Sequence, residues 1–482
     1  MIKSKHNPLR IIALCLLLAT VLPFAVACNK SKGPGHDTTV IDTTDGYVAE
    51  YLPEIDSQGY EFRIVDIQGD IDQDIEGEPV TVVDNAIYKR NALIEGRYNL
   101  TISTNTIANW WETTELAQKL AGSEAAEYDL ITVAINHTST LILSDDVYAA
   151  CDLPSDYIDM SRPWHNQSLN DSVTFDGVHF LDFTAFDVKP GGQCLMYNKG
   201  LIDVLNLEKP YDLVDSGNWT YDKMWSMMKA AGADLDNDYK WTVEDRYGIV
   251  TNYHMMTTLA HLGTGRNLVD VSSGTPVFNK SEGIVNAFMN ATENFSVDGV
   301  YFDVYTEYGI GKGNEHLNEK FANDESLFLY GSTNTLTLLG DMTSDYGVLP
   351  FPKETAEQER YYALSGANIA LILTCHPDAN FVCAIKEALA VESLNYYYPA
   401  YYEQTLKNRY LRDEVDLDYL KLVTDSCVLE LGAQFWADYF RNKIAEEVIK
   451  YKGTNFASYL ESITPQAQGI IDKLMEFVAT KK

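Results

Sequence analysis

The segment between Asp234 and Asp245 has residue types and spacing that suit a cation site. In the run DLDNDYKWTVED, carboxylates stand at the first, third, fifth and twelfth positions: Asp234, Asp236, Asp238 and Asp245. Alternate carboxylates on a tight loop suit a hard cation such as calcium, which takes six or more oxygen ligands. The main-chain oxygen of Lys240 would supply a further ligand. The sequence therefore predicts a structural calcium site in this loop.

Two features of the loop favour the alternative, a solvated acidic turn without metal. Its sixth position is Tyr239, where a sharp turn favours glycine, and its last ligand is Asp245, which reaches less far than glutamate. We keep both interpretations open. In either case any calcium is structural, and no cofactor is predicted to be required.

The remaining reactive side chains form no recognisable catalytic set. The sequence contains no H-E-x-x-H, no G-x-S-x-G and no complete P-loop motif. The run GIGKGN (309–314) lacks a preceding strand, so we interpret it as a loop. Acidic residues are so numerous that no glycosidase carboxylate pair stands out. We predict a non-enzyme, with a secreted glycoside hydrolase as an alternative.

A lone cysteine ends the apolar N-terminal run. Basic residues precede residues 11–27, which are apolar apart from Thr20 and Pro23, and this order is typical of a secretory signal peptide. The stretch Ala25-Val26-Ala27-Cys28 resembles a bacterial lipobox, which implies cleavage before Cys28 and attachment of acyl chains such as palmitate. The alternatives are an ordinary signal peptide, which would leave Cys28 an unpaired thiol, and a retained N-terminal helix.

We therefore predict that residues 1–28 are a signal peptide with a lipobox. Two or more acyl chains would anchor the protein stably to the outer face of the bacterial cytoplasmic membrane. Residues 29–58 carry Gly-Pro-Gly, threonines and acids with little apolar periodicity, and they are predicted to be a flexible stalk.

Charge limits the classes of partner. Without the three basic residues of the signal peptide, 33 basic residues face 70 acidic ones, a net charge of −37. This field disfavours nucleic acid and polyanionic ligands, and it leaves neutral ligands, cations and peptides open. The five cysteines after Cys28 lack metal-binding spacing, and one disulfide among them stays open.

Strands and helices alternate along the rest of the chain, which is long enough for two domains. Strands that alternate with helices predict parallel sheets covered on both faces, with ligands outside the carboxyl ends of the strands. The predicted strands are 60–65, 100–103, 128–133, 327–330 and 346–349, and the predicted helices are 85–97, 112–124 and 221–231.

The chain resembles a family 1 extracellular solute-binding protein, the lipid-anchored receptor of a carbohydrate ABC importer. Eight stretches in order carry the resemblance, among them RPWHNQS, CLMYNKGLI and GNWTYDKMWSM. The full set is 85–102, 162–168, 194–202, 217–227, 245–250, 346–353, 365–371 and 399–414. The family often carries a calcium-like acidic loop near this position, which adds weight to the calcium interpretation.

The resemblance implies a two-lobed α/β clamshell, like the periplasmic binding proteins, with several hinge crossings. The first lobe would comprise residues 59–185 and 349–398, and the second lobe residues 186–348 and 399–482. It also implies a carbohydrate ligand, the transmembrane subunits of an ABC permease as partners, no nucleic acid, and a monomer.

The resemblance further implies which residues face the ligand. One group follows the predicted strand at 128–133, a second precedes CLMYNKGLI, and a third follows LFLYG. The others are aromatic residues near the cleft. The set is Asn136, His137, Thr138, Asp187, Lys189, Ser332, Thr333, Asn334, Trp436 and either Trp110 or Trp111, with Trp111 preferred. Relatives often carry a stacking aromatic after LFLYG, and this sequence lacks it there.

The predicted function is capture of an extracellular sugar or oligosaccharide and its delivery to an ABC-type permease. Sugar rings have apolar faces and many hydroxyl groups, which suit the 31 tyrosines and 7 tryptophans of the chain. Together with the net charge, this predicts a neutral sugar. A second alternative is a surface lipoprotein that holds polysaccharide without transport.

Overall fold

The computed structural model describes residues 46–67, 81–123, 126–366, 368–407, 411, 413–450 and 455–482. Tyr47 to Lys482 form one compact unit. The predicted signal peptide and Cys28 lie outside the described residues. Among the described helices, none combines the length and the apolar character that crossing a membrane requires.

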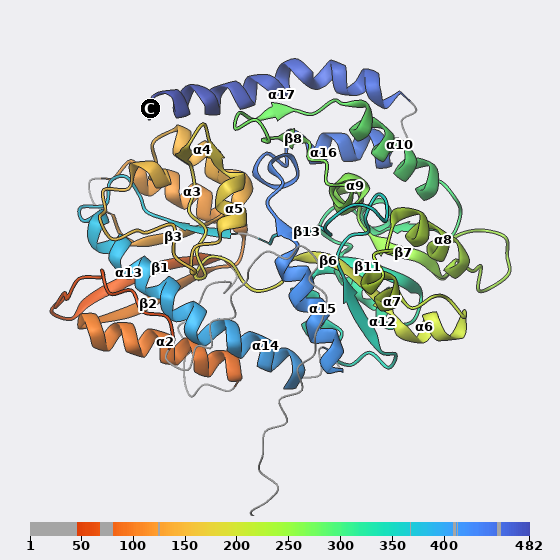
Figure 1. The fold of residues 1–482 in the computed structure, drawn as a ribbon, viewed down its shortest axis with the longest axis horizontal. Coiled ribbons are helices and arrows are strands. Elements are labelled where there is room, and N and C mark those ends of the chain that lie inside the picture. The colour runs from red at the N-terminus through yellow and green to blue at the C-terminus, as the bar shows by residue number, and fades with distance from the viewer. Residues whose placement is uncertain are drawn as a thin grey trace, which may run out of the picture. The chain divides into compact units, whose positions relative to one another are not determined.

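A four-stranded sheet forms the centre of what we call the first lobe (Figure 1). Its order is β14-β3-β1-β2, where β1 pairs in parallel with both β2 and β3. The strands are β1 (Tyr60–Ile67), β2 (Leu100–Ile107), β3 (Leu130–Ala134) and β14 (Asn368–Leu371), and the helices of this lobe include α2 (Val82–Tyr98), α3 (Trp110–Ala121), α4 (Ile135–Leu143), α13 (Ala379–Glu392) and α14 (Tyr398–Lys407). The predicted alternation of strands and helices is confirmed here.

A seven-stranded sheet forms the centre of the second lobe. Its order is β10-β7-β11-β6-β13-β15, and β12 also pairs with β6. The strands are β6 (Gln193–Asn198), β7 (Tyr247–Thr251), β10 (Tyr301–Asp303), β11 (Ser326–Ser332), β12 (Tyr346–Leu349), β13 (Ala363–Leu364) and β15 (Cys427–Val428). Its helices include α6 (Lys199–Val204), α7 (Pro210–Asp215), α8 (Tyr221–Ala231), α9 (Tyr253–His261), α10 (Glu282–Phe295), α11 (Val304–Tyr308), α12 (Asn314–Ala322), α15 (Glu414–Asp425) and α16 (Arg441–Ile444).

Smaller elements complete the fold. They are α5 (Gln167–Ser172), the hairpin of β4 (Thr174–Phe175) and β5 (Val178–His179), the hairpin of β8 (Val269–Asp270) and β9 (Val277–Phe278), the π-helical turns η4 (Ser393–Tyr397), η5 (Leu431–Phe435) and η6 (Ala445–Lys450), and the C-terminal helix α17 (Phe456–Ala479). Helix α17 contacts α4 in the first lobe and α10 in the second. Just after it, Lys481 and Lys482 pair with Asp152 and Asp176 at 2.7 and 2.8 Å.

Both sheets are mixed, whereas the sequence predicted parallel sheets. β14 runs antiparallel to β3, and β6 runs antiparallel to β11, β12 and β13. The reason is that β6 and β14 follow the segments that cross between the two sheets, so each enters its sheet from the side opposite to the local strands.

The return from the second sheet to the first lies after β13. The sequence assigned residues 349–398 to the first lobe, yet β12 and β13 both pair with β6 in the second sheet. The chain reaches the first sheet only at β14, and α14 still contacts α2 there. The short pairings of β13 carry no apolar alternation, which is why the sequence pattern misses this crossing.

Local sequence explains where the main elements begin and end. Thr81 caps α2 by accepting from the Asp84 amide, while the Asp84 carboxylate accepts from the Thr81 amide, a capping box. Asn99 ends the helix in the left-handed region at φ 49°. In the second lobe, a Cβ on Gly248 would lie 2.5 Å from the Met228 side chain, so only glycine lets β7 approach α8 this closely.

The segment from Tyr47 to Gln58 packs on the first lobe, in contrast to the predicted stalk. Ala49 and Leu52 are buried, and the Tyr51 ring stacks on Trp164 with centroids 6.5 Å apart. The Tyr47 amide donates to the Asn395 side chain at 2.7 Å. These aromatic and apolar residues bury surface against α13, so the stalk prediction is wrong for residues 47–58.

A buried charge network lies behind this segment. The ring of His165 is buried, its Nδ1 is 2.7 Å from the Asp182 carboxylate, and its Nε2 is 3.1 Å from the Glu387 carboxylate. Glu387 also accepts from the Trp164 indole at 2.7 Å and from the Tyr51 hydroxyl. Burial lowers the pKa of His165, but the two carboxylates outweigh it and raise the pKa to about 9.

We expect this histidine to make stability depend on pH. An ordinary histidine has a pKa of about 6.5, so the imidazolium stabilises the fold fully below that pH, and its contribution is lost as pH rises through about 9. The loss should be on the order of 3 kcal/mol, measured by urea unfolding between pH 6 and 10.

The His165→Gln variant should show a flatter profile, and His179→Gln, which changes an exposed histidine, should keep the wild-type profile. A wild-type profile that is flat across this range would contradict the role given to His165.

Candidate functional site

A cavity with a volume of about 850 Å³ lies between the two lobes. Its walls come from the end of β3 and the start of α4, from the crossing segment before β6, from the end of β11, and from the region around α16. This is the carboxyl end of strands β3 and β11, where α/β proteins bind their ligands. The volume falls in the upper part of the range of about 300–1,000 Å³ for small-molecule sites.

Most of the residues that the sequence proposed for the ligand site line this cavity. They come from α3, α4, the crossing segment and the turn after β11. The set is Trp111, Asn136, Asp187, Lys189, Ser332, Thr333 and Asn334.

His137 and Thr138 do not line the cavity. Both follow Asn136 on α4, so the helix turns them away from the wall that Asn136 occupies. Thr138 is buried and donates to the Ile135 carbonyl, and His137 Nδ1 lies 2.6 Å from the Thr114 hydroxyl. We therefore assign these two side chains to the packing of the first lobe.

Trp436 lies in the core, so the proposed contact with ligand is replaced by a packing role. Its side chain is 3% exposed, and its ring lies 5.0 and 6.1 Å from the rings of Phe435 and Phe440. The turn around η5 points this indole inward, while Gln434 and Ala437 on either side line the cavity.

Exposed apolar surface on both sides of the cavity is available for stacking. On the first lobe Trp111 is 46% exposed, and on the second lobe Ile310 is 62% exposed. Tyr305 also lines the second wall, where its ring meets His254 edge to face at 5.7 Å. Flat apolar groups on opposite walls suit a ligand with ring faces.

Asp187 lines the cavity, but both oxygens of its carboxylate already have partners within the protein. Its Oδ1 accepts from the Ala370 amide of β14 at 2.8 Å, and its Oδ2 accepts from the Thr184 amide at 3.0 Å. Lys386 of α13 pairs with Oδ2 at 3.3 Å and donates to the Ala370 carbonyl at 2.8 Å. We assign Asp187 to holding the crossing segments in place rather than to direct ligand contact.

A set of polar side chains on the second wall was not predicted from the sequence. It includes Gln193, His254, Asn314, Gln434, Asp438, Arg441 and Asn442. No motif joins these residues, because they lie on separate loops and helix ends that only the fold brings together. One signal was present in GIGKGN, which was correctly interpreted as a loop, and its Ile310 and Gly311 line the cavity.

Arg441 belongs to a short chain of polar contacts on this wall. Its Nε donates to the Asn442 side-chain oxygen at 3.0 Å. The Nδ2 atom of Asn442 donates to the Asp438 carboxylate at 2.8 Å. Burial lowers the pKa of the Arg441 guanidinium below its ordinary value. The guanidinium remains charged at any physiological pH.

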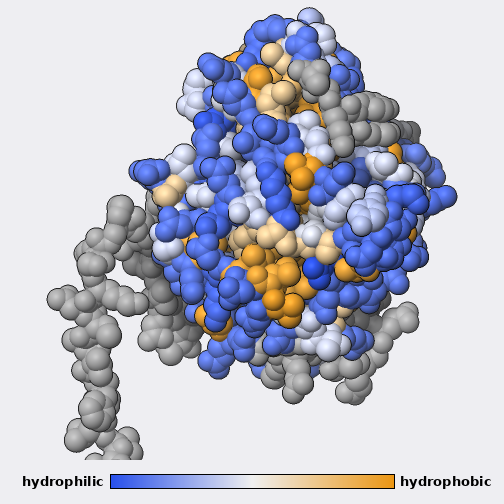
Figure 2. All heavy atoms as spheres, turned by 90° about the vertical axis from the view of Figure 1, so that its right-hand side faces the viewer, coloured by the Kyte–Doolittle hydropathy of each residue, from blue (hydrophilic) through white to orange (hydrophobic). Residues whose placement is uncertain are grey.

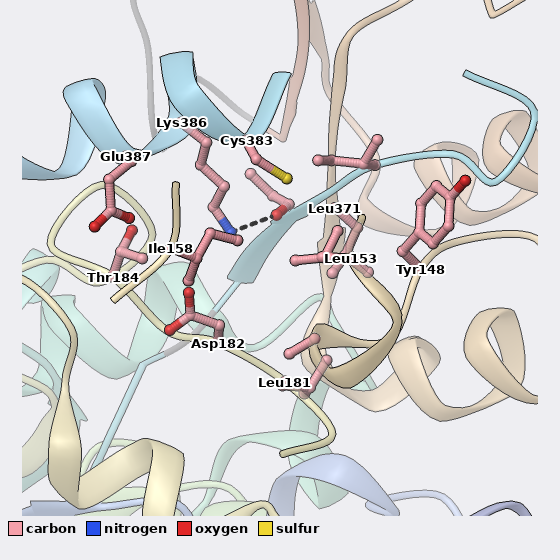
Figure 3. Close-up of a pocket in the computed structure, with 13 residues that line it drawn as sticks. Tyr148, Leu153, Ile158, Leu181, Asp182, Thr184, Leu371, Cys383, Lys386 and Glu387 are labelled. Atoms are coloured by element: carbon pink, nitrogen blue, oxygen red, sulfur yellow. Dashed lines mark hydrogen bonds between the residues drawn. The ribbon is translucent and has the colours of Figure 1, made fainter. Parts of the chain in front are cut away.

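A second, small cavity of about 30 Å³ lies in the first lobe (Figure 3). Figure 3 shows Lys386, Glu387, Asp182 and Cys383 around it, beside apolar side chains such as Leu371. Its volume is far too small for a sugar ring. The cavity between the lobes, which has room for a sugar and is lined from both sheets, is therefore preferred over it as the candidate ligand site.

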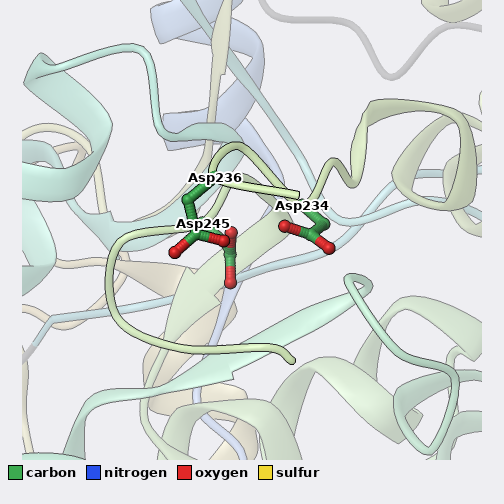
Figure 4. Close-up of side chains that lie close together, drawn as sticks. All are labelled: Asp234, Asp236 and Asp245. Atoms are coloured by element: carbon green, nitrogen blue, oxygen red, sulfur yellow. The ribbon is translucent and has the colours of Figure 1, made fainter. Parts of the chain in front are cut away.

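The acidic loop brings three of its four carboxylates together (Figure 4). Oxygens of Asp234, Asp236 and Asp245 lie within 4.8 Å of one another. Asp238 is not in this group, because its carboxylate accepts from the Lys240 amide at 2.7 Å and pairs with the Lys240 ammonium at 3.1 Å. The predicted ligand set therefore loses Asp238 at its fifth position.

The backbone of the loop already makes the sharp turn that a cation loop needs. Asn237 and Tyr239 adopt φ of 61° and 65°, so Tyr239 takes the conformation that usually favours glycine. The Asp238 amide lowers the pKa of Asp236, but desolvation and the negative charges of Asp238 and Asp234 raise it overall. A cation would relieve this repulsion, so the residues present fit calcium.

Comparison with known proteins places the fold. No protein-family model matches the sequence, and no curated protein matches it. An ABC substrate-binding protein from Listeria monocytogenes in complex with cycloalternan has a TM-score of 0.58 and 16% identity, over 87% of this chain and 99% of that one. A sugar transporter from Rhizobium etli in an open conformation has a TM-score of 0.56 and 14% identity, over 86% and 99%.

A maltose/maltodextrin-binding domain from Bdellovibrio bacteriovorus bound to maltotriose is also similar, with a TM-score of 0.54 and 14% identity over 86% of this chain and 100% of that one. These likenesses establish the fold, which is the two-lobed α/β architecture of sugar-binding proteins from ABC importers. The fold class predicted from the sequence is confirmed.

Proposed function

We propose that the protein is the carbohydrate-binding receptor of an ABC importer, which captures an extracellular sugar or oligosaccharide and delivers it to the transmembrane subunits of a permease. The observation that carries this proposal is the 850 Å³ cavity between two lobes of sugar-receptor fold. Segments that cross between two rigid lobes can act as a hinge, so closure would bury a ligand held between them.

The lining of the cavity supports a saccharide. Trp111 and Tyr305 offer flat faces to sugar rings, and side-chain amides and hydroxyls can exchange hydrogen bonds with sugar hydroxyl groups. The polar group comprises Asn136, Gln193, Asn314, Thr333, Asn334, Asn368 and Gln434.

Binding is favoured over catalysis. A glycoside hydrolase needs two carboxyl groups on either side of the scissile bond. Among the described lining residues, the acidic side chains are Asp187 and Asp438, and the Asp187 carboxylate is saturated by Thr184, Ala370 and Lys386. A lipoprotein that holds polysaccharide without transport would favour a shallow surface groove, whereas this cavity lies between lobes.

Sugar binding should stabilise the protein and close the lobes. A saccharide present at 100 times its dissociation constant should add about 2.7 kcal/mol to the free energy of unfolding, seen as a rise in melting temperature.

Trp111→Ala should weaken binding by ~1–3 kcal/mol in calorimetry if the indole stacks on the sugar. Small-angle scattering should show a smaller radius of gyration with ligand.

Tyr88→Ala is the matched control, because Tyr88 is also an exposed aromatic residue of the first lobe and does not line the cavity. It should leave affinity unchanged. A ligand screen in which peptides bind and no saccharide does would refute the sugar assignment, and glycan cleavage by the purified protein would refute the receptor role.

We further propose that acyl chains on Cys28 hold the mature protein on the outer face of the cytoplasmic membrane. The lipobox-like stretch ending at Cys28 supports this anchor. The Cys28→Ala variant should incorporate no labelled fatty acid and should leave the membrane fraction. Equal membrane retention of variant and wild type would argue against the lipid anchor.

Calcium is proposed as a structural ion of the acidic loop, with Asp234, Asp236 and Asp245 as carboxylate ligands. At ten times its dissociation constant, calcium should add about 1.4 kcal/mol to the stability, a shift in melting temperature of a few degrees. Asp236→Asn should abolish the shift, which differential scanning calorimetry measures with calcium and with chelator.

Asp238→Asn is the control for the same loop. Its carboxylate pairs with Lys240 outside the cluster, so the calcium shift should persist. If calcium leaves the melting temperature of the wild type unchanged, the loop is a solvated acidic turn.

A further inference from the structure

We propose that the saccharide carries an anionic group, the carboxylate of a uronic acid, and that Arg441 binds it. This inference rests on the proposed function, because it names the chemical class of ligand for the same cavity. It revises the expectation of a neutral sugar, which came from the net charge of the whole chain.

Arg441 lines the cavity and pairs with no carboxylate among the described residues. Its hydrogen bond runs from Nε to the neutral Asn442 side chain, and within the described residues no carboxylate lies within ion-pair distance of its guanidinium. In a chain with 70 acidic and 36 basic residues, partners for a cation are abundant. The absence of one at the cavity wall therefore needs an explanation.

Several other cations do have acidic partners, whereas Arg246 and Lys353 donate to main-chain carbonyls instead. Lys199 pairs with Asp416 at 2.7 Å, Lys320 with Glu325 at 3.1 Å, and Lys386 with Asp187 at 3.3 Å. Burial already lowers the pKa of Arg441, so water solvates its charge incompletely. A guanidinium whose terminal nitrogens make no protein hydrogen bond in the described residues is arranged to bind a carboxylate bidentately.

The surroundings add to the positive character of the site. Lys386 neutralises the Asp187 carboxylate, so this carboxylate does not oppose an anionic ligand. Helix α4 begins at this wall with Ala134 at its N-cap, so no side chain caps its first amides. Asp438 and Glu430 are acidic groups near Arg441, but neither pairs with it. Asp438 is exposed and accepts from the Asn442 side chain, and Glu430 is buried and accepts from the Leu268 and Val269 amides.

The charge of the whole molecule limits how many anionic groups the ligand carries. A net charge of −34 repels nucleic acids and other dense polyanions at long range. A short oligosaccharide with one or a few carboxylates experiences weaker repulsion. Pairing of a carboxylate with Arg441 can offset this repulsion. The cavity volume of about 850 Å³ agrees with a short ligand.

The test compares each acidic oligosaccharide with its own methyl ester, which removes the charge and keeps the ring. We would measure calorimetric affinities for trimers of galacturonate, mannuronate and guluronate, for glucuronate-substituted xylotriose, and for maltotriose, cellotriose and xylotriose. At least one uronate should bind about 10- to 100-fold tighter than its ester. A sulfated trisaccharide tests whether a sulfate ester supplies the anion instead.

Variants locate the effect at Arg441. Arg441→Met should bring the acid and the ester to equal affinity, and Arg441→Lys should retain part of the preference, because an ammonium cannot pair bidentately. Lys443→Met is the matched control, since it removes one positive charge from the same short helix without touching the cavity lining. It should leave the preference intact.

The outcomes separate this inference from the proposed function. If neutral saccharides bind and no acidic one binds tighter than its ester, the receptor function stands and the anionic ligand is refuted. If Arg441→Met weakens acid and ester equally, Arg441 contacts hydroxyl groups and the inference fails. If neither neutral nor acidic saccharides bind, both fail.

Discussion

The buried carboxylate of Asp187 joins the parts of the chain that pass between the two lobes. It accepts hydrogen bonds from Thr184 on one crossing segment and from Ala370 of β14, the strand that follows another crossing, and Lys386 on α13 balances its charge. A buried carboxylate without these partners would destabilise the fold by several kcal/mol. The position of Lys189 and of β6, which follow directly, depends on this contact, and so does one wall of the cavity.

The molecule separates its overall charge from the charge of its cavity. Hydrophilic side chains dominate the face in Figure 2, with a small hydrophobic area near its centre, as an acidic protein with a single folded unit would show. At the cavity wall, by contrast, Arg441 has no carboxylate within ion-pair distance among the described residues, and Lys386 neutralises Asp187. Long-range and local electrostatics therefore act on different properties: the first on which partners approach, and the second on which ligand binds.

Regular elements could be predicted from the sequence because their signals are local. Helix α8 and strand β12 have the bounds that periodicity predicts, and β1 extends its prediction by two residues. The crossing after β13 could not be located, since a two-residue pairing leaves no pattern. The docking of residues 47–58 depends on Trp164 and α13, which lie far away in sequence.

The same limit applied to the site. Residues at the ends of predicted strands, such as Asn136 and Thr333, reached the cavity as expected. Trp436 does not line the cavity, because the sequence does not show whether a turn directs an aromatic side chain into the core or toward the ligand site. Arg441 could not be singled out from the sequence. Its distinguishing feature is that no carboxylate lies within ion-pair distance among the described residues, and only the folded structure shows which side chains surround it.

Substitutions in helix α17 can change the affinity for the ligand, although this helix does not line the cavity. Because it touches α4 in one lobe and α10 in the other, any pivoting at the crossing segments must shift one of these two contacts. The free energy of the open state then depends on how well α17 packs there. Substitutions on this surface could change the fraction of competent receptor, and with it the apparent affinity, while every residue that meets the sugar stays the same.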